Sequence, residues 1–376
     1  MGAQVDYVLL RRNALLKSAK THDVDAYLIS NPTNITYLTG FQHPTGCLIV
    51  SAAGATLVAD RETVARAEAD CPGLVVQSHD GVAPLELTVA DVLKKTGIRA
   101  AAVEARSLSV ESLSLLRDAA GKITITPKSG LVEAQRAVKD ASEIEEIRAT
   151  TKIAERAFRM FAPQLRETDT ERDMRDALDA CIRRSGGWDN ALPTVIAVGD
   201  RGAAIDLTPG DTQLAEGSKL LIDFGVRLRY RSRLTRTCKA PFMVTPSRKT
   251  KRERLEYDID TVFAAILGAR DAAIDVLSEG TPIKDADAAV RSALHDAGLG
   301  EFALDVIGHG IGLETIEGPI IRAGAEGDFQ SGMVICLGPG VVIPGWGALR
   351  VADPVLVTRD RAVLLSSRPV TLNELL

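Results

Sequence analysis

LIDFGVRLRYRSRLTRT, residues 221–237, is the stretch of sequence that decides the fold of the second half of the chain. It begins as a strand, because aliphatic residues lead into Asp223, and after a short polar turn it returns as a second strand that ends in SRLTRT. A carboxylate behind a run of aliphatic residues is costly to bury unless something binds it. We expect Arg233, on the returning strand, to lie opposite it. The hairpin therefore predicts either a working site or an internal ion pair.

The composition is that of an ordinary globular protein with enough residues for two domains. The chain has 376 residues, 45% hydrophobic and 25% charged, with a formal net charge of -5. No long basic block stands out, so neither nucleic acid nor a membrane surface is expected as a partner. No apolar run reaches the ~20 residues of a membrane helix, and the first residues lack the apolar stretch of a signal peptide.

The cysteines are scattered, odd in number and without a CxxC pair. This pattern favours reduced thiols and a cytoplasmic location over a disulfide framework or a zinc–thiolate site. They are Cys47, Cys71, Cys181, Cys238 and Cys336.

The first part of the chain alternates strands with helices. GCLIVSAAGATLVAD, residues 46–60, has the pattern of a hairpin, residues 25–30 and 100–104 that of strands, and residues 84–96 and 109–120 that of helices. This spacing predicts an α/β domain with a mixed or largely parallel sheet.

The pattern changes near residues 130–140, and we predict domains at 1–132 and 133–376. Asp140 and Glu143 resemble a capping box at the start of a long amphipathic helix. Further helices are expected over 170–184, 250–278 and 283–297, with strands and glycine-rich loops around them.

Four segments interrupt apolar strands with glycine, proline and polar residues. They are 191–211, 221–237, 306–319 and 332–358. In the third, VIGHGIGLETIEGP, glycines on both sides of His309 let the backbone approach a neighbour closely and place an imidazole on a turn. Alone, this pattern also suits a surface loop. Beside a buried Asp223, we interpret His309 as part of a site.

In order and spacing, the four segments resemble those of the creatinase, Xaa-Pro dipeptidase and methionine aminopeptidase family. SNPTNITYLTGF, residues 30–41, resembles its creatinase-type N-terminal domain, so the resemblance covers nearly the whole chain. It implies an α/β (α+β) fold, with a creatinase-type α/β domain followed by a pita-bread domain. In that second domain a curved antiparallel sheet is lined by helices, and the site lies inside the curve. The resemblance also implies a homodimer.

The peptidases of this family hold two divalent metal ions with two Asp, one His and two Glu. Carboxylates bridge the ions, and the ions activate water and polarise the peptide carbonyl. Position by position, Asp223 and His309 match, but Arg233 stands where the second Asp is expected, and Gly338 and Ala352 stand where the glutamates are expected. A guanidinium keeps its proton and repels a dication. The resemblance therefore implies no dinuclear centre and no metal cofactor here, while a single weak ion on the two matching residues stays open.

Two further histidines of the family's peptidases are also replaced. Asp206 aligns with one, and Ile316 stands in place of the other, beside a retained Glu317. Creatinase itself offers a precedent for metal-free chemistry, because it hydrolyses a C–N bond of a small guanidino acid with a histidine as general base. By that resemblance the catalytic candidates are Asp206, His309 and Glu317, with Asp206 or His309 as the base.

Two interpretations of Arg233 stay open. It could pair with Asp223, or with Asp206 if that residue reaches it, simply as an internal ion pair in place of the metals. Alternatively, the same groups face a cleft and bind a small polar or peptide-like ligand, whose carboxylate is held by Arg233 and Arg350 and whose cationic end is held by the acidic residues. His43, in GFQHPTG, is a weaker ligand candidate, because N-terminal domains of this family can approach a neighbouring subunit's site.

Three functions follow from the resemblance. The first is a dipeptidase-like protein that has lost its metals and acts by binding a ligand in the old cleft. The second is a metal-independent, creatinase-like hydrolase of a small guanidino or N-blocked amino acid. The third is a peptidase with one metal ion on Asp223 and His309. Whether the protein is an enzyme stays open, and if it is one, we expect a hydrolase.

Overall fold

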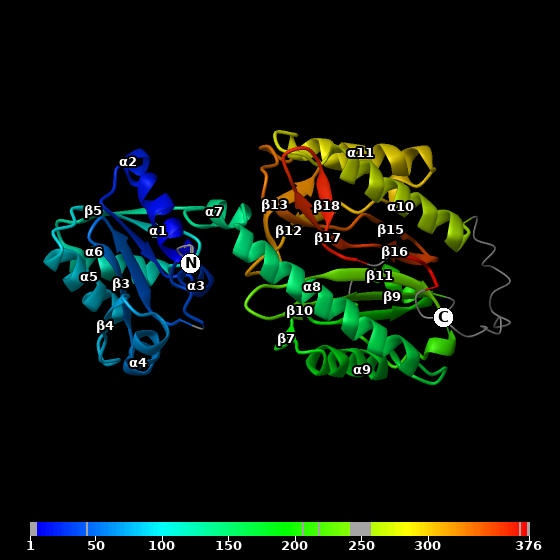
Figure 1. The fold of residues 1–376 in the computed structure, drawn as a ribbon, viewed down its shortest axis with the longest axis horizontal. Helices are drawn as coiled ribbons and strands as arrows, with labels where there is room; N and C mark the ends of the chain where they lie inside the picture. The colour runs from blue at the N-terminus through cyan, green and yellow to red at the C-terminus, as the bar shows by residue number, and fades with distance from the viewer. Residues whose placement is uncertain are drawn as a thin grey trace, which may run out of the picture. The chain divides into compact units, whose positions relative to one another are not determined.

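The structure is a computed structural model that describes residues 6–42, 44–204, 207–216, 219–240, 257–367 and 370–373. It divides into two compact units, Met1–Arg136 and Ala137–Leu376 (Figure 1). Among the described helices, none is both long and apolar enough to cross a membrane.

The first unit alternates helices and strands as the sequence predicts. Its elements are α1 (Tyr7–Lys17), α2 (Ala19–His22), β1 (Ala26–Ile29), α3 (Pro32–Thr39), β2 (Cys47–Ser51), β3 (Gly54–Ala59), α4 (Arg61–Asp70), β4 (Val75–Ser78), α5 (Leu85–Lys95), β5 (Ala100–Glu104), α6 (Val110–Ala120), β6 (Thr124–Lys128) and α7 (Glu133–Ala137).

These strands form one sheet in the order β4-β3-β2-β1-β5-β6 across the described residues. β1 pairs antiparallel with β2 and parallel with β5, so the predicted mixed sheet is confirmed. In the segment SNPTNITYLTGF, the Asn31 side chain accepts from the Thr33 N–H and caps α3, and Gly40 ends the helix with φ 77°. The segment is thus a strand end followed by a capped helix.

Among its described residues, the second unit has two pairs of helices and four small antiparallel sheets. Its elements are α8 (Ala141–Phe161), α9 (Glu171–Arg184), β7 (Asp189–Asn190), β8 (Val195–Val198), β9 (Lys219–Phe224), β10 (Val226–Arg227), β11 (Leu234–Lys239), α10 (Ile259–Val276), α11 (Ile283–Asp296), β12 (Val306–Gly310), β13 (Glu317–Arg322), β14 (Val334–Leu337), β15 (Gly340–Ile343), β16 (Gly347–Arg350), β17 (Asp353–Val357) and β18 (Ala362–Leu364).

The predicted helices of this unit are present. At the start of α8, Asp140 and Glu143 form the predicted capping box. The helix expected over 250–278 is described only from 259 onward, as α10, because residues 250–256 lie outside the described ranges.

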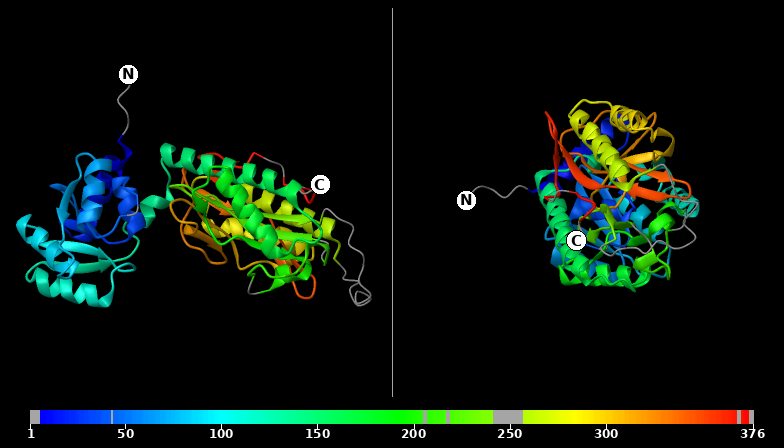
Figure 2. Two further views of the ribbon diagram at one scale, coloured as in Figure 1. Left: turned by 90° about the horizontal axis from the view of Figure 1, so that it is seen from below. Right: turned by 90° about the vertical axis from the view of Figure 1, so that its right-hand side faces the viewer.

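The main sheets of this unit have the orders β11-β9-β8 and β13-β12-β14-β17-β18, and β15 pairs with β16. The three-stranded and the five-stranded sheet meet where Thr235 and Ala352 exchange backbone hydrogen bonds of 3.1 and 3.0 Å. The right-hand view of Figure 2 shows α10 and α11 (yellow) and the green helices on opposite sides of these strands.

Each sheet buries one face against its own pair of helices. Ile222 and Phe224 of β9 pack in a core with α8 and α9, whereas Ile335 and Leu337 of β14 pack in a second core with α10 and α11. Because side chains alternate along a strand, the residues between them point to the opposite faces, away from the helices. These inner faces hold the candidate site.

Candidate functional site

Asp223 is directed to the inner face of its sheet by this alternation. Its neighbours in sequence, Ile222 and Phe224, belong to the core of α8 and α9. Across the sheet Asp223 lies directly opposite Val195 on one side and Thr235 on the other. Directly opposite residues of antiparallel strands share a face, so Thr235 brings a hydroxyl beside the carboxylate.

Arg233 forms the predicted ion pair with Asp223. Its Nε donates to Oδ1 at 3.0 Å and its Nη2 donates to Oδ2 at 2.5 Å, a bidentate arrangement, while Thr235 Oγ1 also donates to Oδ1 at 3.1 Å. Both side chains are only 12% exposed. Burial alone would lower the pKa of Arg233, but the hydrogen bonds and charge of Asp223 outweigh it and raise that pKa.

His309 lies on the other side of the same guanidinium, within β12 and not on the turn that the sequence predicts, because it pairs with Ile320 and Cys336 of the neighbouring strands. Arg233 Nη1 is 3.0 Å from His309 Nε2, and His309 Nδ1 is 2.9 Å from the carbonyl oxygen of Gly310. A guanidinium only donates, so Nε2 accepts and the proton sits on Nδ1, which donates to Gly310. Burial first, and then the cations Arg233 and Arg350, lower the pKa of His309 to about 4 against the opposing bond to Gly310. At neutral pH His309 is an uncharged ring with its lone pair already used.

Arg350 is the fourth side chain of this group. Its neighbour Leu349 packs in the core of α10 and α11, so Arg350 points to the inner face. It is half-buried, and its Nε donates to the carbonyl oxygen of Gly338 at 3.1 Å. Burial lowers the pKa of Arg350, and the positive charge of Arg233 lowers it further. The negative charge of Asp223 raises this pKa, but it only partly offsets the other two effects.

Glu317 has partners of its own. Its Oε2 accepts from Lys139 Nζ at 3.0 Å, with the two side chains 5% and 1% exposed, and its Oε1 accepts from the Glu314 N–H at 3.0 Å. A Cβ placed on Gly312 would lie 2.7 Å from Oε2, so the glycine is needed for this turn to close on the carboxylate. These contacts make Glu317 a buried anion held by a buried cation.

Two of the predicted site residues, Asp206 and His43, lie outside the described residues. Their roles as base and ligand contact stay predictions. Two partners within the site were not predicted. Thr235 could have been suggested by its place two residues after Arg233, whereas no local pattern links Lys139 to a carboxylate 178 residues away.

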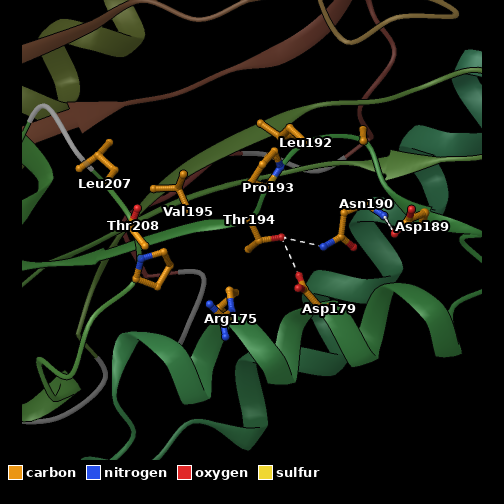
Figure 3. Close-up of a pocket in the computed structure, with 12 residues that line it drawn as sticks. Arg175, Asp179, Asp189, Asn190, Leu192, Pro193, Thr194, Val195, Leu207 and Thr208 are labelled. Carbon is orange, nitrogen blue, oxygen red and sulfur yellow. Dashed lines mark hydrogen bonds between the residues drawn. The ribbon is translucent and has the colours of Figure 1, made fainter.

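A cavity of about 710 Å³ lies at the β8 edge of the β11-β9-β8 sheet. Part of its wall comes from residues 191–211, the first of the four segments singled out in the sequence. Residues 189–195 and 207–209 line it, together with Arg175 and Asp179 of α9 (Figure 3). Leu207 also packs against Leu221 and Ala348, on the inner face that carries Asp223 and Arg350. This apolar contact connects the wall of the cavity with the neighbourhood of the ion pair.

In the part of the chain that the structure describes, no group of three or more His, Cys, Asp or Glu side chains lies close enough together to hold a metal ion.

The sequence matches the metallopeptidase family M24 over residues 145–359 and the creatinase/prolidase N-terminal domain over residues 11–138. The chain belongs to the metallopeptidase family M24. An Xaa-Pro dipeptidase of Pyrococcus furiosus is 27% identical to this M24 chain over 360 residues, covering 95% of this chain and 97% of the relative. An uncharacterized peptidase of Staphylococcus saprophyticus is 28% identical over 363 residues, covering 93% and 97%.

Solved structures agree with this assignment. An Xaa-Pro dipeptidase from Bacillus anthracis superposes with a TM-score of 0.87 at 25% identity, covering 97% of this chain and 99% of that one. A dipeptidase from Mycobacterium ulcerans gives a TM-score of 0.82 at 27% identity, covering 99% of both chains. The predicted fold, a creatinase-type domain followed by a pita-bread domain, is thereby confirmed.

Proposed function

We propose that this M24 chain has lost the dinuclear metal site of its peptidase relatives and binds a small polar or peptide-like ligand in the former active-site cleft. The observation that carries the proposal is the Arg233 guanidinium, which is hydrogen-bonded to both carboxylate oxygens of Asp223 and to Nε2 of His309. These are the lone pairs with which the two matching ligands would hold a metal ion. A fixed cation already occupies them.

The residues present do not fit a metal pair. A divalent ion near Asp223 would face the Arg233 charge, and arginine does not relieve such repulsion by losing a proton. Positions 338 and 352 bring a glycine and an alanine, with no oxygen ligands in their side chains. The peptidase names of the relatives therefore describe those proteins, and we transfer only their fold and cleft to this chain.

The alternative, a metal-independent creatinase-like hydrolase, requires a general base. His309 is poorly suited, because the lone pair on its Nε2 already accepts from Arg233 and its pKa is lowered to about 4. Glu317 is also poorly suited, because Lys139 neutralises it at 3.0 Å. The alternative thus depends on Asp206 acting as the base. Consumption of a bound compound in the experiment below would support it.

Metal analysis of the purified protein, combined with an Xaa-Pro dipeptide assay in added manganese or cobalt, tests the proposal. We expect substoichiometric metal and no turnover. Stoichiometric metal with turnover would refute the proposal. Without metal, a thermal-shift screen of guanidino acids, betaines and dipeptides then separates binding from hydrolysis, because a hydrolase consumes the compound that stabilises it.

Arg233→Asp is the matched variant for the metal assay. It returns an oxygen ligand beside Asp223 and removes the competing cation, so we expect its metal affinity to exceed that of the wild-type protein. Equal affinities would indicate that Arg233 does not stand at the second Asp position of the family. The homodimer, the cytoplasmic location and the domain limits 1–132 and 133–376 stay proposals.

A further inference from the structure

Arg350 differs from Arg233 in how its charge is balanced. Its Nε donates to Gly338, and among the described residues no carboxylate lies within ion-pair distance of its guanidinium and no acceptor meets its terminal Nη groups. Arginine keeps its charge even when half-buried. Two Nη groups with an edge geometry suited to a carboxylate therefore stand unused beside the ion pair.

The charges around Arg350 do not cancel. Asp223 and Arg233 neutralise one another at 2.5 Å, and His309 is an uncharged ring, because its Nε2 accepts from Arg233 while its Nδ1 donates to Gly310. Among the described residues, these four side chains therefore carry one net positive charge, and that charge belongs to Arg350. Burial, and after it the charge of Arg233, lower the pKa of Arg350, while the charge of Asp223 opposes them. A single external negative charge would balance the group.

The backbone of Arg350 is fixed by Thr237, and its side chain by the bond from Nε to the carbonyl oxygen of Gly338. Thr237 Oγ1 accepts from the Arg350 N–H at 3.0 Å and donates to the Arg350 carbonyl oxygen at 3.0 Å. A Cβ built on Gly338 would lie 3.1 Å from both Nε and Nη2 of Arg350, so the absent side chain at 338 provides the space in which the guanidinium lies. A donor fixed in this way loses little conformational entropy on binding.

We infer that Arg350 binds the carboxylate of a small monocarboxylic acid, which is the ligand class of the cleft. This inference rests on the proposed function, and it narrows the sequence-based expectation that Arg233 and Arg350 bind a carboxylate together, since Arg233 is engaged by Asp223 and His309. A planar monoanion matches both the fork of the guanidinium and the single net charge. A phosphate dianion would leave an unbalanced negative charge in a largely buried site.

Binding of [¹³C]acetate, followed by ligand-observed NMR at constant ionic strength, tests this inference. Acetamide serves as the neutral isostere, and inorganic phosphate as the second oxyanion. We expect acetate to bind the wild-type protein more tightly than acetamide or phosphate. Arg350→Gln should weaken acetate binding about 10- to 100-fold, the range for loss of a charge-assisted hydrogen-bonded pair. Arg350→Lys should weaken it less, because it keeps the charge but loses the fork.

Arg322→Gln is the matched control, because Arg322 is exposed at the end of β13 and its loss should leave acetate binding unchanged. The inference is overturned if acetate does not bind, if acetamide or phosphate binds as tightly, or if both Arg350 variants bind acetate like the wild-type protein. Such failure leaves the proposed function standing when metal and dipeptide turnover are absent. Metal with turnover refutes the proposed function whatever acetate does.

Discussion

Replacing Arg233 by methionine removes the cation of the central ion pair while keeping much of its side-chain volume. The variant loses two hydrogen bonds to Asp223 and one to His309. In the described part of the chain, the Asp223 side chain then keeps only its bond from Thr235, at a site where it is 12% exposed. Removing one partner of a buried pair typically costs about 3–5 kcal/mol, because the other charge stays buried and unpaired. We expect a loss in that range.

Tryptophan fluorescence during urea unfolding measures this loss of stability in the second unit, which contains Arg233. The two tryptophans, Trp188 and Trp346, both lie in the second unit, and Trp346 is buried. The matched control is Arg227→Gln in the same hairpin, where Arg227 pairs with Asp189 but the side chains are 30% and 60% exposed. An exposed pair of this kind contributes at most about 1 kcal/mol.

A double variant, Arg233→Met with Asp223→Leu, separates the pair from other effects of the substitution. Removing both charges leaves no unpaired ion, so at least half of the stability lost in the single variant should return. The reasoning is refuted if Arg233→Met costs no more than Arg227→Gln, or if the losses of the two single substitutions simply add in the double variant. Either result would mean that the two charges are solvated rather than dependent on one another.

Three further predictions concern other buried ionisable groups. The pKa of His309 is lowered from 6.5 to about 4, so the unfolded state takes up a proton at a higher pH than the folded state does. The unfolding free energy, measured by urea unfolding, should therefore fall as the pH drops from 6.5 towards 4, by about 2 kcal/mol at pH 5. Glu171→Gln should increase amide hydrogen exchange over residues 198–210, measured by mass spectrometry, because the buried Glu171 carboxylate accepts from backbone N–H groups at both ends of that segment. Lys139→Met should cost about 3 kcal/mol in the unfolding free energy, because it leaves Glu317 buried without its cation.

Exposed residues of the same types provide the controls. His295→Gln should leave the pH dependence of stability unchanged, whereas His309→Gln should flatten it between pH 6.5 and 4. Glu167→Gln should leave exchange over 198–210 unchanged. Lys239→Met removes an exposed pair, since Lys239 and Asp260 are 33% and 62% exposed, and should cost at most about 1 kcal/mol. Each prediction is contradicted if the buried variant behaves like its control.

Local patterns account for the parts of the fold that the sequence predicts well. Asp140 and Glu143 lie three residues apart, and a capping box needs only that spacing and a helix to start. The pairing of Asp223 with Arg233 is also local, because a hairpin brings together residues only ten positions apart. The interpretation of that pair as internal glue and its interpretation as a ligand site could not be separated from sequence, since both use the same two residues.

The remaining contacts depend on how distant strands meet. Arg233 and His309 are 76 residues apart, and their bond joins the residue just before β11 to β12, a strand of another sheet. Whether His309 is a base or an acceptor follows from which donor reaches its Nε2, and no sequence pattern carries that information. The same limit applies to the ion pair of Lys139 and Glu317, because these residues are 178 positions apart in the sequence.

The two arginines of the site therefore have different consequences under our proposal. Arg233 brings a covalently attached cation to the lone pairs of Asp223 and His309, and its bidentate geometry fixes it there. Because that cation cannot dissociate, the charge of Asp223 is balanced without a metal ion from solution. Among the described side chains of the site, Arg350 is then the unbalanced charge, since Asp223 is already engaged by Arg233. The proposed loss of the metals and the proposed anion site at Arg350 thus both depend on the same residue of the hairpin, Arg233.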